Sequence, residues 1–408
     1  MNLIGKRTVL VGLLGAILAI HALLFWFWWR SAAEGYADFT IFYTAGKLVG
    51  SGQGHRLYDS GLQFQLQQNF APHVQNRKGA LPYNHPAAEA LIFVPLTWLD
   101  YGAAYLVWDL INLAILAILP ILLRPHIPLL ARASPLFWFA LLLAYFPVLA
   151  TLMQGQDAIL SLLLYALAFA ALNRNADAGA GFWLGLGMFR FHLILPLVLI
   201  LLLCCKRKKL IPSFLLTVTA LAAISIAITG WVAALQYPQY VWHLEQITGG
   251  GGIFPAVMPN LRGLLQGWSA AHEFPIVVQI TVISLSAVLL FWVIRTPRNH
   301  RASQHEFGFQ FSLATVTTLL ISYHSYAYDL IVLAIPVLVI LSYTSELDDR
   351  PWKQTIWLLF PIGVLFCTPL YIWLGSRTYH LNLLAIVLLF WLWAMRREVS
   401  KRLVLCET

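Results

Sequence analysis

Charged residues are scarce in this chain: of its 408 residues only 11% are Asp, Glu, Lys or Arg, while 60% are apolar. The mean hydropathy is +0.74. A soluble domain could not bury so much apolar surface, so the composition excludes an ordinary globular protein and indicates a polytopic membrane protein. Internal repeats and low-complexity segments are also missing, and the two halves of the chain do not match in charge or loop pattern.

Cysteine is equally sparse, with Cys204, Cys205, Cys367 and Cys406 the full complement. None of them has metal-ligand spacing, and adjacent cysteines are poorly placed to pair, so we expect neither a disulfide framework nor a zinc site. No cofactor is expected, although a divalent metal is left open. The net charge of +9 comes from short basic clusters between apolar runs. Such clusters indicate membrane topology rather than a nucleic-acid partner.

Long apolar runs set the topology, and the first of them, 8–29, is interpreted as a retained helix with its N-terminus in the cytoplasm. Each later run approaches or exceeds the roughly 20 residues that a spanning helix needs. These runs lie at 102–123, 134–152, 156–173, 210–232, 274–295, 307–323, 327–344, 353–374 and 379–396.

Two topologies place the basic cluster 206–209 in the cytoplasm. In the first, 86–99 spans the membrane and 178–205 is a single helix. In the second, 86–99 only dips into the outer face, and 178–205 is a pair of half-spans broken near 189–192. We favour the second, because it leaves more Lys and Arg on the cytoplasmic side and because 86–99 is short for a span.

The favoured topology predicts an all-α membrane protein with about twelve transmembrane helices, formed as a single domain over 1–408. Both termini are cytoplasmic, and the large external loops are 30–101 and 233–273. Carboxylates, imidazoles, arginines and amides from separate stretches then share the external face, as in an active site assembled on a scaffold. The groups on that face are Asp38, Tyr58, Asp59, Tyr83, Asn84, His85, Gln156, Asp157, Arg190, His192, Asn260, Arg262, His324 and Asp329.

Asp38 lies among aromatic residues where the chain leaves the first apolar run. One interpretation is a helix cap, since Asp is a favoured N-cap residue and a helix is expected to begin near Phe39. The other is a general base, because partial desolvation beside lipid makes a carboxylate more basic. Both interpretations can hold together.

Arg190 lies between two phenylalanines inside an apolar stretch. A charged residue inside a membrane segment is a functional candidate, and the N–H donors of its guanidinium could bind a lipid phosphate. The alternative is an arginine that extends to the headgroups. His324 precedes Asp329 by five residues, a pair that could orient an imidazole or bind a metal, although an interfacial hydrogen bonder is an equally simple explanation.

Other polar residues have plainer alternatives. His192, Asp59 and Asp157 could be loop-capping groups, and Glu89 and Asp109, which lie inside apolar stretches, could be polar helix contacts or site lining.

Several short motifs together resemble glycosyltransferase family 87. They are Asp38-Phe39 with Phe42-Tyr43 and Ala45, then Leu57-Tyr58-Asp59, Tyr83 to Pro86 followed by 90–96, Trp108 and Asn112, Gly155-Gln156, 180–196 and 322–329. The chain departs from the family at Pro86-Ala87, where a second proline is usual. It also departs at Arg190, near which a lysine is usual, and in 233–273, which matches only loosely.

The resemblance implies a GT-C fold with juxtamembrane helices in the first external loop. It also implies an inverting hexosyltransferase that uses a polyprenyl-phosphate sugar, mannose by resemblance with arabinose open. The acceptor would be a lipid-linked sugar or a glycan at the external face of the cytoplasmic (inner) membrane. On this view Asp38 is the general base, with His324 as a further catalytic residue. Arg190 and His192 bind the donor phosphate, and Tyr43, Tyr58, Asp59, Tyr83, Gln156, Asn260 and Asp329 contact sugar or acceptor.

Two rivals come from other classes of membrane protein. A secondary transporter has many spans and intramembrane charges, but its halves are usually repeated and its charges lie near the midplane. A flippase for lipid-linked sugars, or a polymerase-type partner in envelope assembly, is the second rival. Neither should release free polyprenyl phosphate.

Overall fold

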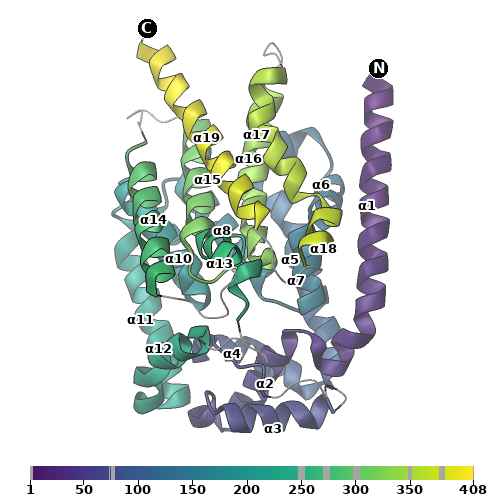
Figure 1. The fold of residues 1–408 in the computed structure, drawn as a ribbon, viewed down its shortest axis with the longest axis vertical. Coiled ribbons are helices and arrows are strands. Elements are labelled where there is room, and N and C mark those ends of the chain that lie inside the picture. The colour runs from purple at the N-terminus through teal and green to yellow at the C-terminus, as the bar shows by residue number, and fades with distance from the viewer. Residues whose placement is uncertain are drawn as a thin grey trace. The chain divides into compact units, whose positions relative to one another are not determined.

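The computed structural model describes residues 3–72, 74, 79–246, 253–269, 276–296, 304–347, 352–375 and 382–407. Over these ranges the chain is helical and contains no strand (Figure 1). Helices suit a chain this apolar, because they satisfy every backbone polar group within the segment. The α-helices are α1 (Leu3–Ser31), α2 (Phe39–Gly50), α3 (Ser60–Phe70), α4 (Ala87–Phe93), α5 (Tyr101–Leu123), α6 (Pro135–Leu143), α7 (Phe146–Gln154), α8 (Ala158–Asn173), α9 (Asp177–Leu186), α10 (Phe191–Leu203), α11 (Leu210–Thr229), α12 (Trp231–Gln246), α13 (Leu261–Ser269), α14 (Ile276–Ile294), α15 (Gln304–Ile321), α16 (Ala334–Ser345), α17 (Trp352–Leu365), α18 (Thr368–Gly375) and α19 (Leu383–Glu407).

Short helical turns of other types join these elements. A π-helical turn, η1 (Ala32–Tyr36), follows α1. The 3₁₀ turns are η2 (Gly54–Arg56), η3 (Val94–Trp98), η4 (Pro128–Arg132), η5 (Gly187–Arg190), η6 (Pro255–Val257) and η7 (Ala327–Leu333).

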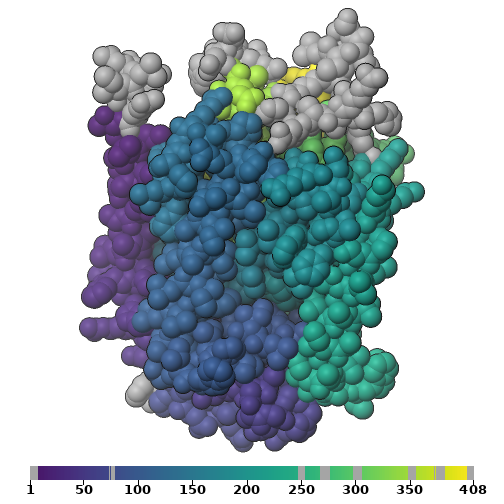
Figure 2. All heavy atoms as spheres, turned by 180° about the vertical axis from the view of Figure 1, so that it is seen from behind, coloured from purple at the N-terminus to yellow at the C-terminus, as the bar shows by residue number. Residues whose placement is uncertain are grey.

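By length and composition alone, six helical stretches among the described residues are candidate membrane spans, or seven if the bent pair α6–α7 counts as one. They are Thr8–Gly50, Tyr101–Leu123, Asp177–Leu203, Leu210–Thr229, Ile276–Ile294 and Ala327–Ser345, and α6 and α7 meet at 70°. Exposed apolar side chains along α5, such as Leu110 and Ile118, suit a lipid-facing helix. The blue part of Figure 2 contains this segment at the surface. The all-helical membrane class is therefore confirmed, while the number of about twelve crossings stays a prediction.

The stretch from α9 to α10 returns to the side where it began. Arg207, just past α10, donates from a guanidinium nitrogen to Oδ1 of Asp177 at the start of α9, over 3.0 Å. A straight helix of these 27 residues would hold its ends about 40 Å apart. The reversal falls at η5, where Arg190 has a non-helical backbone (φ −109°, ψ 56°). The predicted break near 189–192 is therefore present, and the single-helix alternative is wrong.

Segment 86–99 forms α4 and the short turn η3. The twelve helical residues Ala87–Trp98 extend for about 20 Å, which is short of the roughly 30 Å hydrocarbon core. The segment packs closely on α2, where Phe42 stacks on Phe93 with ring centroids 4.7 Å apart. In Figure 1, α2, α3 and α4 run across the far end of α1. The alternative in which 86–99 spans the membrane is therefore wrong.

The described chain divides into two compact units, and each is described here by itself. The first comprises Met1–Ile115, Leu149–Ile159 and Leu215–Phe254, and the second Leu116–Val148, Leu160–Phe214 and Pro255–Thr408. The core of the first unit is aromatic, with Phe39 in ring contact with Phe93, Tyr101 and Tyr105. In the second unit α15 packs against α10, α16 and α19.

Candidate functional site

Asp38 stands at the sharp turn between η1 and α2. Gly35 makes this turn with φ +100°, and a Cβ there would come 2.3 Å from the Cβ of Ala71, so only glycine fits. Asp38 occupies the N-cap position of α2, yet its side chain makes no capping hydrogen bond. The capping interpretation of Asp38 is therefore wrong.

The carboxylate of Asp38 is instead bound by the corner that joins α7 to α8. Gln156 donates from Nε2 to Oδ2 of Asp38 over 2.8 Å, and the backbone N–H of Asp38 donates to Oε1 of Gln154 over 3.2 Å. Asp38 is partly buried and Gln156 is buried. An amide fixed in this way holds the carboxylate in one orientation.

Gly155 allows this corner to approach α2. Its φ is +59°, and a Cβ there would lie 2.7 Å from the Cβ of Phe39 and 2.8 Å from the ring of Tyr105. Helix α5 holds the corner from the other side, because Trp108 donates its indole N–H to the carbonyl of Gly155 over 3.0 Å. Gly155 and Trp108 thus position Asp38 and Gln156.

Tyr58 and Tyr83 lie together in the first unit. Their rings stack with centroids 6.4 Å apart, and Tyr58 donates its hydroxyl to the carbonyl of His85 over 3.0 Å. Burial, followed by the nearby Tyr240 and Glu89, raises the pKa of the Tyr58 phenol well above its ordinary value. Burial likewise raises the pKa of Tyr83. Both phenols therefore remain hydrogen-bond donors at neutral pH.

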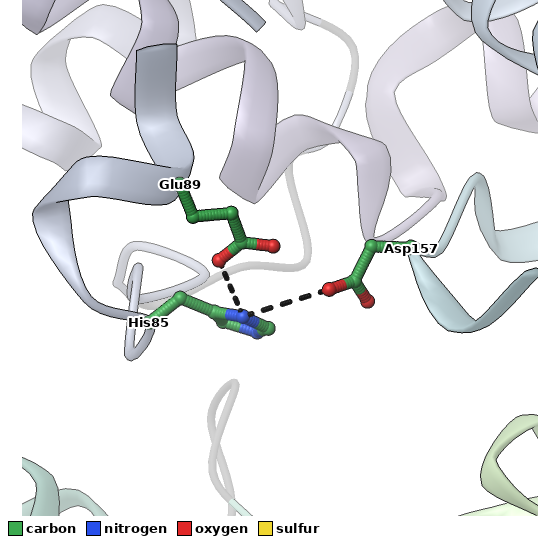
Figure 3. Close-up of side chains that lie close together, drawn as sticks. All are labelled: His85, Glu89 and Asp157. Atoms are coloured by element: carbon green, nitrogen blue, oxygen red, sulfur yellow. Dashed lines mark ion pairs between the residues drawn. The ribbon is translucent and has the colours of Figure 1, made fainter. Parts of the chain in front are cut away.

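One cluster in the first unit has the composition of a metal site. In Figure 3, Glu89 from α4 and Asp157 from the corner before α8 both face the imidazole of His85. Nδ1 of His85 lies 2.7 Å from Oε2 of Glu89 and 3.9 Å from Oδ2 of Asp157. All three ligand atoms lie within 4.8 Å of one another. The sequence placed His85 and Asp157 among the polar groups of the external face, with a capping alternative for Asp157, and Glu89 was interpreted as a polar helix contact or site lining; none of the three was assigned a specific role.

Tyr43 and Asp59 have structural partners. Tyr43 is buried and donates its hydroxyl to the carbonyl of Leu99 over 2.7 Å. Asp59 caps α3 by accepting from the N–H of Leu62 over 3.0 Å, and it pairs with Arg56. The Leu62 N–H, and then Arg56, lower the pKa of the Asp59 carboxyl. The capping alternative for Asp59 is thus realised.

In the second unit, Arg190 and Asp329 form a buried ion pair. They come from η5 and η7, and the Arg190 guanidinium also lies 5.4 Å from the ring centroid of Tyr328. Oδ2 of Asp329 accepts from the backbone N–H of Tyr326 over 2.7 Å. Asp329 therefore orients Arg190, and the guanidinium is buried rather than extended to the headgroups.

His192 and His324 lie side by side near this pair in the second unit. Their ring centroids are 5.6 Å apart, and the ring of Tyr326 lies 5.0 Å from that of His324. The loop that carries His324 is clamped by Asn260, which is fully buried. Asn260 donates from Nδ2 to the carbonyl of Ser322 over 3.0 Å and to Oγ of Ser325 over 3.2 Å.

Arg262 is a further buried cation at the same loop. It donates to the carbonyl of Tyr323 over 3.0 Å, and its guanidinium lies 4.0 Å from the centroid of the Tyr323 ring. The sequence placed Arg262 among the polar groups of the external face but did not predict that its side chain is buried. Residues 247–252 and 270–273 of the external loop 233–273 lie outside the described ranges.

The fold is that of an all-helical, multi-pass membrane protein, with an oriented carboxylate in one unit and a buried arginine–aspartate pair in the other. The family model of glycosyltransferase family 87 matches residues 83–322, which is more than half of the chain. The chain therefore belongs to glycosyltransferase family 87, a GT-C family. Tyr83, Gln156, Arg190, His192 and Asn260 fall inside the matched range, whereas Asp38, His324 and Asp329 fall outside it. Searches of curated proteins and of solved structures each find no match.

Proposed function

We propose that this glycosyltransferase is an inverting hexosyltransferase that moves mannose from a polyprenyl-phosphate donor to a lipid-linked or glycan acceptor. The reaction takes place at the external face of the cytoplasmic membrane, and the chain crosses that membrane about twelve times with both termini in the cytoplasm. The observation that carries the proposal is the 2.8 Å hydrogen bond from Gln156 to Asp38, since it orients a partly buried carboxylate in a member of this family.

Asp38 is the general base. It takes the proton from an acceptor hydroxyl while the hydroxyl oxygen forms a bond to the anomeric carbon. The bond from that carbon to the phosphate oxygen breaks on the opposite face, and the polyprenyl phosphate leaves with the electron pair. The anomeric carbon is inverted. One carboxylate is sufficient because phosphate is a good leaving group, whereas a glycosidase needs a second carboxyl to protonate the departing oxygen.

Arg190, His192 and His324 stabilise the charge that develops on the departing phosphate. The buried ion pair supports this role for Arg190, because Asp329 fixes the direction of the guanidinium before a substrate arrives. The 5.6 Å separation of the His192 and His324 rings supports a common role for the two imidazoles. Tyr58, Tyr83 and Gln156 contribute hydroxyl and amide groups for sugar or acceptor.

The test uses purified full-length protein with a synthetic polyprenyl-phosphate mannose and a series of lipid and glycan acceptors. We expect a mannosylated product together with an equal amount of free polyprenyl phosphate. Asp38→Asn should reduce kcat by about 10²–10⁴-fold, the usual contribution of a general base, while donor binding is retained.

Asp100→Asn is the matched control, because Asp100 is an exposed carboxylate of the same unit that caps α5. Asn caps helices as well as Asp does, so this variant should keep its activity. Wild-type turnover by Asp38→Asn would refute the assignment of the base. Movement of the intact donor across the membrane, without release of polyprenyl phosphate, would instead identify a flippase or transporter.

A further inference from the structure

The cluster of His85, Glu89 and Asp157 is distinct from the Asp38–Gln156 pair, and the reaction described above assigns none of its three side chains a chemical role. Its members come from separate places in the chain: the loop before α4, α4 itself, and the α7–α8 corner. The side chains of Glu89 and Asp157 are 1% and 0% exposed, whereas that of His85 is 13% exposed. The two carboxylates are thus buried, and the imidazole is the part of the cluster that solvent partly reaches.

The separations of the three ligand atoms fit one metal ion. Donor atoms that each lie about 2.0–2.2 Å from a common ion are about 3 to 4.4 Å from one another. The observed separations are 2.7 Å and 3.9 Å, and none of the three exceeds 4.8 Å. Shifts of a few tenths of an ångström would bring the three atoms onto one ion.

Charge supports the same conclusion. Two buried carboxylates face one imidazole, whose Nδ1 lies within ion-pair distance of an oxygen of each. A divalent cation bound there would contact both carboxylates at once, with the imidazole as its third, neutral ligand.

The neighbours of the cluster hold its ligands in place. Tyr58 donates to the carbonyl of His85, and the hydroxyl of Tyr83 lies 3.4 Å from Oε2 of Glu89. The His85 ring lies 5.2 Å from that of Phe42 and stacks on Tyr83 at 5.7 Å. Such fixed partners orient metal ligands in proteins.

We propose that His85, Glu89 and Asp157 bind one divalent transition-metal ion. Mixed imidazole and carboxylate ligands favour Mn²⁺, Fe²⁺ or Zn²⁺ over Ca²⁺, which prefers a shell of oxygens. Three protein ligands leave positions for water on the side of the partly exposed imidazole.

Because Asp157 follows Gln156 directly, the ion would also fix the corner that orients Asp38. The metal site would then position the proposed base without touching it.

Metal binding is measured without donor or acceptor, so its outcome is independent of the proposed transfer reaction. Full-length protein in detergent is stripped with EDTA and titrated with Mn²⁺, and the six-line electron paramagnetic resonance signal of free Mn²⁺ is followed. We expect one ion per chain. Asp157→Asn and Glu89→Gln should weaken binding by at least about 10-fold, since loss of an outer-sphere partner alone costs about 10–100-fold. Asp100→Asn should bind like the wild type.

A spectroscopic measurement on the wild type covers the case in which these variants do not fold. Electron spin-echo modulation of the bound Mn²⁺ should show one coordinated ¹⁴N, and His85→Gln should abolish it. Absence of saturable binding, absence of the nitrogen coupling in the wild type, or undiminished binding by both folded carboxylate variants would overturn the metal site. The cluster would then be an ion pair of His85 with Glu89.

Discussion

Gln156 donates its amide N–H to Oδ2 of Asp38 over 2.8 Å, although the two residues are 118 positions apart in the chain. Gln156 is fixed in turn by the α7–α8 corner, which Trp108 and the packing of Gly155 hold against α2. Asp38 is consequently oriented by residues from α5 and the corner before α8, rather than by the helix that it precedes.

Replacement of Gln156 by alanine should lower kcat more than it changes the KM for the donor. A hydrogen bond to a charged group contributes about 1.5–3 kcal/mol, so loss of this orientation should reduce kcat by about 10–100-fold. Steady-state kinetics with varied donor and acceptor provide the measurement, and Gln154→Ala is a useful comparison. Gln154 accepts from the backbone of Asp38 rather than contacting its carboxylate, so its loss should have the smaller effect. Equal kcat for Gln156→Ala and the wild type would contradict the positioning role.

Gly155→Ala should destabilise the first unit and reduce activity. The new Cβ would lie 2.7 Å from that of Phe39, and alanine is strained at φ +59°. Strain of about 1–2 kcal/mol adds to an overpacking cost of about 1–3 kcal/mol. Thermal unfolding in detergent checks this prediction. Gly52→Ala is the matched control, since Gly52 has φ +74° but nothing within 4 Å of its added Cβ. Equal melting temperatures for the two variants would show that the close contact between the corner and α2 does not contribute to stability.

The buried pair of Arg190 and Asp329 should behave as a unit in a double-mutant cycle. Either Arg190→Met or Asp329→Asn alone should cost about 3–5 kcal/mol of unfolding free energy, because removing one partner leaves the other with an uncompensated buried charge or polar group. The double variant should cost less than the sum. Unfolding in mixed SDS and detergent micelles gives these free energies.

Arg207 and Asp177 provide the reference cycle for this measurement. Their side chains are more exposed, at 21% and 12%, and water weakens their interaction, so each single substitution should cost less. Additive effects at Arg190 and Asp329 would contradict the pairing.

His126 should make stability depend on pH. It lies between α5 and η4, and burial, followed by the charge of Arg174, lowers the pKa of its imidazole. The unfolded chain then binds the proton more readily than the folded chain. Stability is fully present above the unfolded pKa of about 6.5 and is lost as the pH falls below it. The melting temperature of the wild type should decline as the pH falls from 8 to 5, and this decline should be smaller in His126→Gln. The exposed His55→Gln should leave the decline unchanged.

Much of the fold was predictable from local sequence. The apolar runs marked the helices, and the charged Arg190 among phenylalanines marked the place where the α9–α10 stretch turns back. Asp38 was open to two interpretations, a helix cap and a general base, and its side chain makes no capping hydrogen bond but accepts one from Gln156. Local propensity identifies the N-cap position, but a partner from another helix determines where the carboxylate points.

The all-helical membrane class could be predicted from the sequence alone, because the length and apolarity of each segment are local properties that favour a helix in lipid. Membership of glycosyltransferase family 87 also follows from the sequence, through its match to the family model. Three contacts are visible only in the folded structure: Gln156 donates to Asp38, Asp329 pairs with Arg190, and His85 and Glu89 face Asp157. These partners are far apart in the chain except for His85 and Glu89. Their meeting depends on how the helices pack, for which no local pattern in the sequence carries a signal.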